Sequence, residues 1–594
     1  MNNLFIPPFS EQLLLKRKKI KKELLSQQLD WLDKKIAILG GSTTHDIKDM
    51  LELFLLYHGI RVEFYESEYN QYWQEVMFDN IKLEQFKPDI IYIHTSNRNI
   101  LSYPMLSDSK EKVDCLLDNT YHHFSEMWER IGEKYRCIII QNNFEYPYWR
   151  LQGNREATDI HGTVNFVTKL NIMFAEYAQK HNYFFINDIN YLSANYGLER
   201  WFEPFDWYMY KYVLSMQAIP TLAYSVANII KSLYGKNKKA FALDLDNTLW
   251  GGIVGDEGPE NLKIGLETST GQIYTEFQEY LKAHQQLGVI LNIISKNEYQ
   301  SACAGLNHPD MTLKQDDFVM IKANWEPKSQ NLIDIAHTLS LTPDSFVFVD
   351  DNPAEREIIR QQIKNAAVPE VGDNPEGFIK AIDKMGYFEV TLVSDDDIYR
   401  EKMYQENVQR AKEKLSFRNY TEYLISLEMN AEIAGFIPTY YNRIAQLSNK
   451  SNQFNLTTRR YTQAEIENIA TNDDYVTLYG RLTDKFGDNG VVSVVIGHQN
   501  KEIINIELWI MSCRVLKRNM ECAMMDVFVD KCRERGIQKI IGHYYPTAKN
   551  GMVKDFYSKQ GFSKVNEDNQ GNSRWILDVD EYKLMNDVIK IDCK

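Results

Sequence analysis

The sequence predicts an α/β protein built from several domains. At 594 residues, the chain is too long for one hydrophobic core. Apolar strands alternate with helical patterns through the first two blocks, which indicates parallel sheets, whereas the last block mixes helices with longer strands, which indicates an α+β domain. We expect a first domain, a second domain, a linker helix and a third domain at residues 1–235, 236–390, 391–415 and 416–594.

The first domain is predicted to begin with a helical leader, Glu11–Lys34, followed by a strand from Lys35. That strand runs into Gly40-Gly-Ser-Thr43 and then into a helix, which is a βα unit. Similar apolar strands recur at Asp89–His94, Arg136–Gln141 and Tyr183–Ile186. The pattern predicts a parallel sheet covered by helices.

The second and third domains are separated by a charged helix that we expect from Asp395 to about Lys414. The second domain has predicted strands at Ala240–Leu243, Val289–Ile294 and Phe346–Val349. The third has predicted strands at Tyr475–Arg481, Val491–Ile496 and Ile503–Trp509.

Composition excludes several classes of protein. The net charge of −15 argues against a nucleic-acid or anionic-membrane partner. Seven cysteines at scattered positions, with no CxxC pair, indicate neither a disulfide framework nor a zinc knuckle. No signal-peptide pattern and no apolar run of about 18 residues is present, so we expect a reduced, cytoplasmic protein.

Polar residues follow each predicted strand of the second domain. Asp244 and Asp246 come directly after the first strand, and Asp350 with Asp351 after the third. An isolated DxD is weak evidence, because Asp often caps helices or turns loops. Here the second strand also ends in Ser295-Lys296-Asn297, and Lys328 precedes the third strand. Carboxyl ends of parallel strands meet at one edge of a sheet, so these side chains are expected to form one site.

This ordered set resembles the haloacid dehalogenase (HAD) superfamily of phosphoryl-transfer enzymes. The resemblance implies a Rossmann-like domain in which Asp244 is the nucleophile and Asp246 the general acid and base. Mg²⁺ suits a cluster of carboxylate oxygens, and the expected ligands are Asp244, Asp246, Asp350 and Asp351. The expected phosphate-binding residues are Thr248, Ser295, Lys296 and Lys328.

Longer motifs are similar to the FkbH-like family within this superfamily. They are Asp244–Gly258, Asn449–Tyr461, Asp484–Gly490 and Met511–Val515. The resemblance implies a glyceryl transferase/phosphatase of polyketide biosynthesis. Such an enzyme takes 1,3-bisphosphoglycerate, removes phosphate and loads glyceryl onto the phosphopantetheine thiol of an acyl carrier protein. The alternative is a stand-alone Mg²⁺-dependent phosphatase that acts on a small phosphorylated metabolite.

Residues 416–585 resemble the GNAT acyltransferase fold. In that fold a Gly-rich loop that opens a helix cradles the pyrophosphate of acyl-CoA. The corresponding segment, Arg514–Met520, has no Gly. A carrier arm bears one phosphate and requires less of this loop, so the difference favours a carrier thiol over free CoA.

Two residues of the third domain are candidates for acyl chemistry. Cys513 follows a strand beside Arg514 and before a predicted helix, which favours a reactive thiol, but a small core residue is the alternative. His543, at another strand end, is either a general base or a structural histidine. Four further residues are either the lining of a substrate pocket or a solvated loop: Asn452, Asn455, Thr457 and Arg459.

The first domain has a flavodoxin-like pattern and resembles the SGNH hydrolases, with Ser42 in the position of the nucleophile. Those enzymes also need a His that activates the Ser. The corresponding segment, Asp206-Trp-Tyr-Met209, has Met in the place of that His. We interpret the domain as a degenerate SGNH-like module for binding or docking.

Overall fold

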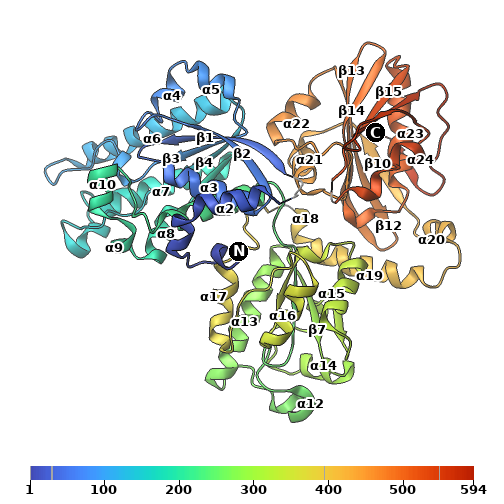
Figure 1. The fold of residues 1–594 in the computed structure, drawn as a ribbon, viewed down its shortest axis with the longest axis horizontal. Helices are drawn as coiled ribbons and strands as arrows, with labels where there is room; N and C mark the ends of the chain where they lie inside the picture. Colours follow the sequence, from blue (N-terminus) through green and yellow to red (C-terminus); the bar gives the residue numbers. More distant parts are fainter. Residues whose placement is uncertain (1, 28–30, 394, 548, 594) are drawn as a thin grey trace. The chain divides into compact units, whose positions relative to one another are not determined.

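A computed structural model describes residues 2–27, 31–393, 395–547 and 549–593 (Figure 1). The chain divides into two compact units. One comprises the residues up to Leu233 with the short segment Thr462–Ala464, and the other comprises Tyr234–Tyr461 with Glu465 onward. Each unit is described in turn.

The first unit is built on a parallel sheet of five strands in the order β2-β1-β3-β4-β5. This is the flavodoxin-like order, in which the strand sequence reverses between β1 and β3 and ligands bind at the carboxyl ends of the strands. The strands are β1 (Leu32–Gly40), β2 (Ile60–Glu66), β3 (Ile90–His94), β4 (Ile138–Asn142) and β5 (Phe184–Asn187).

Helices connect and cover these strands. α6 and α7 pack on one face through an aromatic core that includes Phe124, Trp128 and Phe174. The helices of this unit are α1 (Glu11–Leu15), α2 (Arg17–Leu25), α3 (His45–Tyr57), α4 (Gln74–Met77), α5 (Ile81–Phe86), α6 (Lys110–Lys134), α7 (Thr163–Lys180), α8 (Ile189–Tyr196), α9 (Leu198–Trp201), α10 (Pro204–Tyr210) and α11 (Ile219–Leu233).

The predicted helical leader is too long at its carboxyl end. Helix α2 ends at Leu25, and Lys34 belongs to strand β1, which starts at Leu32. Strand β1 starts three residues earlier than expected because it pairs with β2 from Leu32, which lies opposite Ile60. The sequence analysis did not assign β2. An ion pair between Arg61 and Asp33 fixes this register at the surface.

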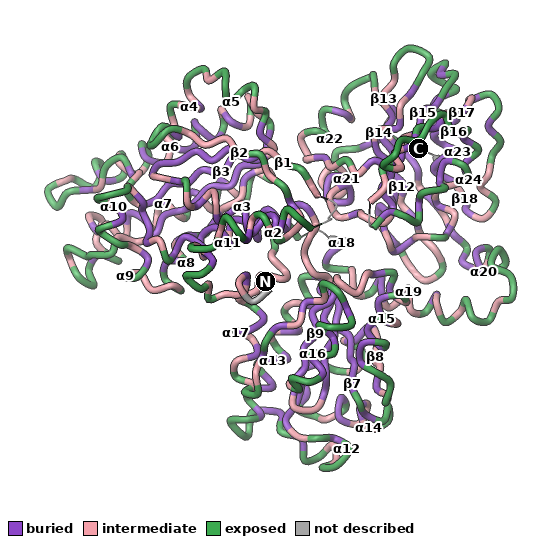
Figure 2. Tube along the Cα trace, viewed as in Figure 1, coloured by how far each residue is buried: buried purple, intermediate pink, exposed green. Residues whose placement is uncertain are grey.

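The second unit contains the predicted second domain, whose four strands are all parallel in the order β8-β7-β6-β9. They are β6 (Ala240–Leu243), β7 (Ile290–Ser295), β8 (Met320–Ala323) and β9 (Phe346–Val349). Residues of β6, β7 and β9 are buried throughout, as expected for a sheet covered on both faces (Figure 2). Its helices are α12 (Val254–Glu257), α13 (Ser269–Gln286), α14 (Tyr299–Leu306), α15 (Lys328–Thr338), α16 (Pro353–Gln362) and α17 (Phe378–Asp383).

Helices α18 (Asp395–Ile398) and α19 (Arg400–Lys414) follow, close to the expected charged helix. Arg410 of α19 is almost fully buried and forms an ion pair at 2.7 Å with Asp484, whose side chain is fully buried. Arg518 lies 3.1 Å from the same carboxylate. The helix is therefore fixed to the C-terminal sheet by a buried network of charges.

The C-terminal sheet has nine strands, eight of them in the order β16-β17-β15-β14-β13-β12-β10-β18. They are β10 (Asn430–Ala434), β12 (Tyr475–Asp484), β13 (Gly487–Asn500), β14 (Ile503–Met511), β15 (Lys539–Tyr544), β16 (Ser563–Glu567), β17 (Ser573–Asp578) and β18 (Lys590–Cys593). The helices of this part are α20 (Tyr420–Ser426), α21 (Pro438–Lys450), α22 (Gln463–Ala470), α23 (Met520–Glu534) and α24 (Phe556–Lys559).

Strands β14 and β15 are parallel and pair only at their beginnings, over Ile503–Asn505 and Lys539–Ile541. Beyond this point the end of β14 pairs instead with the ninth strand, β11 (Phe454–Asn455), which inserts antiparallel beside it. The backbone N–H of Tyr545 donates to the carbonyl of Leu456 at 2.9 Å, so the inserted segment also contacts the chain just after β15. The opening between the two diverging strands is thus filled by the chain itself.

Among the described residues, every helix is either too short or too polar to cross a lipid bilayer.

Candidate active site

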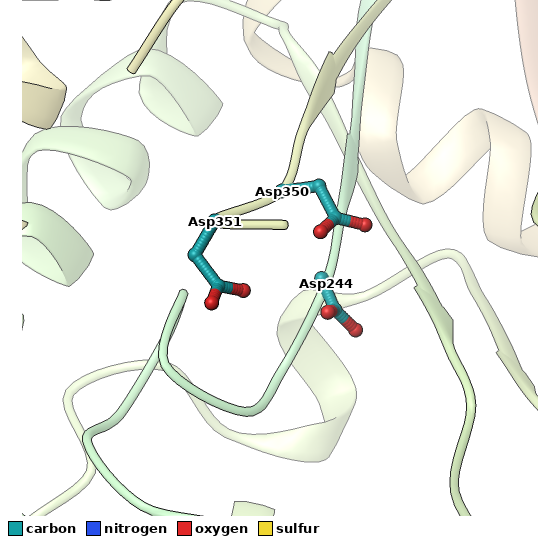
Figure 3. Close-up of side chains that lie close together, drawn as sticks. All are labelled: Asp244, Asp350 and Asp351. Atoms are coloured by element: carbon teal, nitrogen blue, oxygen red, sulfur yellow. The ribbon is translucent and has the colours of Figure 1, made fainter. Parts of the chain in front are cut away.

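Three carboxylates converge at the carboxyl ends of β6 and β9 (Figure 3). These strands are neighbours, with Leu243 opposite Val349, so Asp244 and Asp350 emerge side by side. Together with Asp351 they offer carboxylate oxygens that all lie within 4.8 Å of one another. A cluster of hard oxygen donors of this size fits Mg²⁺, with water completing its coordination.

Lys328, at the start of α15, lies inside this cluster and is only 3% exposed. Its Nζ lies 2.8 Å from Oδ2 of Asp244 and 2.6 Å from Oδ2 of Asp350. Burial alone would lower the pKa of Lys328, but the two carboxylates outweigh it and hold that pKa above its ordinary value. The lysine therefore carries a positive charge beside Asp244 and Asp350.

The same crowding acts on the carboxyl groups. Burial, reinforced by the charge of Asp244, raises the pKa of Asp350 to about 6. The pKa of Asp351 is also raised, first by burial and then by Asp244. Carboxylates held this close repel one another, which favours a divalent cation among them.

Ser295, the last residue of β7, donates a hydrogen bond from Oγ to Oδ1 of Asp244 at 2.6 Å. Asn297 donates to this Oγ at 3.2 Å and to Oδ2 of Asp246 at 2.8 Å. Asn297 was not among the predicted catalytic, phosphate-binding or metal-binding residues, although it lies only two residues after Ser295. Lys296, which it did assign, lies 2.6 Å from Glu355 and contacts none of the three clustered carboxylates.

Asp246 was expected among the metal ligands, but its carboxylate is not part of the three-carboxylate group. Its Oδ1 accepts hydrogen bonds from Nε1 of Trp250 at 2.9 Å and from the backbone N–H of Val254 at 3.0 Å. With Asn297 on Oδ2, three donors hold this side chain. The cause is a loop that folds back after β6, because the backbones of Gly251 and Lys263 pair with each other.

Thr248 contacts the carboxylate cluster. Its Oγ1 lies 3.3 Å from Oδ1 of Asp351 and accepts a hydrogen bond from the backbone N–H of Asp351 at 3.1 Å. In this arrangement Thr248 orients Asp351, and its predicted contact with phosphate remains a prediction.

The surroundings of Cys513 differ from those that the sequence suggested. Cys513 begins a 3-10 helix of three residues, whereas α23 starts only at Met520, so the thiol is not at the N-terminus of a long helix. The guanidinium of Arg514 donates to the carbonyl of Asn489. The Cys513 thiol is partly exposed and lies 3.8 Å from the hydroxyl of Tyr404 on α19.

His543 lies within β15, where it pairs with Arg574 of β17. Burial, and then the charges of Arg574 and Arg459, lower its pKa. Strands β14 and β15 diverge after Asn505 and Ile541; His543 lies on β15, and Cys513 follows the end of β14. Their joint role in catalysis remains a prediction.

The polar residues around β11 have partners within the protein. Arg460 donates to the carbonyls of Ser448 and Ser451 and to the side chain of Asn452. Side chains of Asn455 and Thr457 are buried, and Thr457 donates to the carbonyl of Glu507 at 2.6 Å. Arg459 is half exposed and pairs with Glu507 at 2.6 Å. These contacts hold the inserted strand in place, and the predicted substrate pocket remains a prediction.

Comparison with known proteins gives two kinds of match. Residues 35–231 match the family model described as the FkbH N-terminal domain. A solved structure from Bacteroides fragilis, the N-terminal part of protein BF1531 containing a phosphatase domain complexed with Mg, is 29% identical with a TM-score of 0.58. The match covers 63% of this chain and 99% of that one. Comparison with curated proteins found no match.

Acetyltransferase structures match about a quarter of the chain. The ribosomal-protein-S18-alanine N-acetyltransferase from Escherichia coli is 11% identical over 25% of this chain and 94% of that one, with a TM-score of 0.21. The PaiA N-acetyltransferase from Thermoplasma acidophilum, in complex with coenzyme A, is 12% identical over 25% of this chain and 99% of that one, with a TM-score of 0.20.

The predicted fold class, a multidomain α/β protein with parallel sheets and a mixed third domain, is confirmed. The Asp244 constellation lies where the sequence predicted it, at the carboxyl edge of a parallel sheet. Together with the N-terminal family match and the likeness to a magnesium-bound phosphatase, it supports an FkbH-like phosphatase of the HAD type.

Proposed function

We propose that the protein is a glyceryl transferase/phosphatase. It removes phosphate from a phosphoglyceryl unit of 1,3-bisphosphoglycerate and loads glyceryl onto an acyl carrier protein for polyketide biosynthesis. The observation that carries the phosphatase half is the convergence of Asp244, Ser295 and Lys328 beside two further carboxylates. The transferase half rests on the family resemblance of the whole chain.

The geometry of this carboxylate site supports phosphoryl transfer. A carboxylate oxygen of Asp244 attacks phosphorus, and the bond from phosphorus to the substrate oxygen breaks. Lys328 neutralises charge on the transferring group, and Ser295 orients the nucleophile. Mg²⁺ bound by Asp244, Asp350 and Asp351 would screen the repulsion between carboxylate and phosphate.

Proton transfer is assigned to Asp246. Its carboxylic acid gives a proton to the leaving oxygen, and the resulting carboxylate then takes one from the water that attacks the aspartyl-phosphate. To do so it must exchange the donors Trp250 and Val254 for the substrate. A movement of the loop that carries these two donors is thus part of the cycle.

We assign acyl transfer to Cys513, which lies near the amino end of β6, whereas the carboxylate cluster lies at the carboxyl end of that strand. Lys239 precedes β6 and interacts electrostatically with the Cys513 thiol, whereas Asp244 follows β6. Burial lowers the pKa of Lys239. Four strand residues span about 13 Å at about 3.3 Å each. A phosphoglyceryl thioester on Cys513 would not reach Asp244, so phosphate is removed before acylation or on the carrier arm.

The test is to incubate the protein with Mg²⁺, 1,3-bisphosphoglycerate and a phosphopantetheinylated carrier, and to record the intact masses of both proteins. A glyceryl adduct on the carrier, absent when the carrier lacks its phosphopantetheine, is the expected result. Cys513→Ala should abolish the adduct and leave the hydrolysis of a simple phosphate monoester unchanged. An undiminished adduct in this variant would remove Cys513 from the mechanism.

A stand-alone phosphatase acting on a small phosphorylated metabolite is the second candidate. The insertion of β11 beside β14 favours it, because the edge of β14 is already paired with Phe454 and Asn455 and offers no backbone groups to an extended ligand. The same experiment separates the two functions. Phosphate release without any adduct on the carrier supports the second.

A further inference from the structure

The carboxyl edge of the first sheet holds two buried polar atoms that have no hydrogen-bond partner among the described residues. They are Oγ of Ser42 and Nε2 of His94. The two residues are only 2% and 1% exposed. Buried polar side chains are nearly always hydrogen-bonded, so a pair without partners at the ligand-binding edge of this fold needs an explanation.

A chain of hydrogen bonds fixes the proton on His94. The amide of Asn142 accepts on Oδ1 from Asn187 at 2.8 Å and donates from Nδ2 to the carbonyl of Thr95 at 3.2 Å. The same Nδ2 lies 3.0 Å from Nδ1 of His94 and must donate to it. Nδ1 is therefore an acceptor, and the proton of the neutral ring is on Nε2.

His94 is thus a neutral donor. Burial lowers its pKa to about 4, so the ring carries no charge near neutral pH. A ring with its proton on Nε2 cannot remove the proton of Ser42 through that nitrogen. The site therefore offers hydrogen bonds to a ligand and lacks the base of a serine hydrolase.

The two atoms lie on the same side of β3. Nδ1 of His94 faces Asn142 of β4, so Nε2, across the ring, faces the β1 side of the sheet. There His94 is opposite Gly40, and its carbonyl accepts from the backbone N–H of Gly41 at 2.8 Å. Ser42 follows directly, in the loop before α3.

Two more segments surround this loop. The backbone N–H of Thr43 donates to the carbonyl of Lys211 at 3.1 Å, which joins the loop to the end of α10. Arg98, in the segment after β3, lies over the ring of Trp207 in α10 at 4.2 Å and over the ring of Phe202 at 4.9 Å. The ammonium of Lys211 lies 5.3 Å from the Trp207 ring. The loop, the β3 segment and α10 therefore meet around Ser42.

The groups around Ser42 range from buried and uncharged to exposed and charged. The innermost groups, Ser42 and His94, are uncharged, the Trp207 ring is half-buried, and Arg98 is exposed. Glu145 interacts electrostatically with Arg98, but burial raises the pKa of Glu145 to about 8, so it leaves the charge of Arg98 largely uncompensated near neutral pH. A ligand that fits has an uncharged acceptor oxygen at one end, an apolar stem and an anion at the other.

We propose that this site binds the phosphopantetheine arm of a carrier protein. An amide or thioester carbonyl accepts from Ser42 and His94, the stem packs on Trp207, and the phosphate lies at Arg98 and Lys211. A phosphoglyceryl substrate fits less well, since its second anionic end would meet only neutral groups. The assignment of a carrier arm as the ligand rests on the proposed function, whereas the site itself does not.

The experiment is calorimetric titration of the full chain, in EDTA, with 4′-phosphopantetheine, pantetheine and inorganic phosphate. EDTA removes divalent cations, so phosphate binding at Asp244 is suppressed. We expect 4′-phosphopantetheine to bind about fivefold or more tightly than pantetheine, because the latter lacks the charge-assisted contacts. Inorganic phosphate alone should give no measurable binding.

Variants locate the site. Lys211→Gln and Trp207→Ala should each weaken 4′-phosphopantetheine by about fivefold, and Ser42→Ala should weaken both pantetheine compounds equally. Lys19→Gln, which changes an exposed lysine of α2, should have no effect. The site would be overturned if 4′-phosphopantetheine did not bind the wild type. It would also be overturned if this ligand bound the wild type, Lys211→Gln and Ser42→Ala with equal affinity.

Phosphate release by the same variants separates this proposal from the proposed function. All of them should retain it, because none contributes to the Asp244 cluster. Binding of the arm by a protein that forms no glyceryl adduct would refute the transferase while leaving the site in place. Adduct formation that is unchanged in Lys211→Gln, with no arm binding, would refute the site alone.

Discussion

The first sheet and the sheet of the phosphatase domain place polar side chains at the same topological position with opposite electrostatic character. At the carboxyl ends of β6 and β9 the chain presents Asp244, Asp350 and Asp351 around a buried lysine. At the ends of β1 and β3 it presents Gly40 and His94, with no charge at the centre. The fold supplies an edge where ligands bind, and the residues that end each strand determine which chemistry occurs there.

The largest expected effect comes from changing Asp244, the proposed nucleophile. Asp244→Asn keeps the size of the side chain but lacks the anionic oxygen that attacks phosphorus, so phosphate release should fall at least about 10³-fold. Release is measured with a phosphate monoester, and circular dichroism checks the fold. Asp256→Asn, an exposed carboxylate in α12, is the control and should be fully active. Comparable turnover by the two variants would refute the role of Asp244.

Removal of divalent cations should impair the Asp244 site and leave ligand binding around Ser42 unchanged. In EDTA we expect phosphate release to fall about 10²-fold or more, because a bound cation offsets several kcal/mol of charge repulsion. Adding Mg²⁺ in excess should restore it. The site around Ser42 contains no carboxylate cluster in the described residues, so titration of 4′-phosphopantetheine should give the same affinity with and without EDTA. A parallel loss at both edges would show that the sites are not independent.

The sequence was sufficient for the charged edge because each functional residue there directly follows an apolar strand. Asp244 and Ser295 need only strand ends and a parallel sheet to meet. Asn297 and the position of Asp246 were missed, since they depend on how the loop from Asp246 to Lys263 folds back. A pattern of residue types does not contain that information.

Contacts between residues far apart in the sequence explain why the surroundings of Cys513, Asn452 and Asn455 could not be predicted. Cys513 was placed at a helix start, but its partner Tyr404 comes from a helix more than 100 residues earlier in the chain. The side chain of Asn452 accepts from Arg460, and Asn455 belongs to the inserted strand β11; the spacing of these residues in the sequence does not indicate either contact. Polar side chains that stabilise an irregular segment and those that bind a ligand are of the same types, so spacing alone does not distinguish them.

The stability of the first unit should depend on pH through Glu145. Its pKa is about 8 in the folded protein against an ordinary 4.5, so the folded state binds more protons between these values. The free energy of unfolding of the first unit should therefore fall as pH rises from about 5 to 8, by up to roughly 1.4 kcal/mol per pH unit. Glu145→Gln should remove this slope in urea denaturation. Glu111→Gln, at the exposed start of α6, should keep it, and an unchanged slope in Glu145→Gln would contradict the assignment.

The smallest expected effect tests how Asp246 is held at the charged edge. Trp250→Phe keeps a buried ring but deletes the indole N–H that donates to Oδ1 of Asp246. Freed from one of three donors, the carboxyl group should turn more readily toward a leaving oxygen. We expect alkyl phosphates, which need a proton on the leaving group, to gain about two- to fivefold in turnover relative to an aryl phosphate, which does not. If both substrates change by the same factor, Trp250 supports the loop as a whole, and the contact with Asp246 has no separate part in proton transfer.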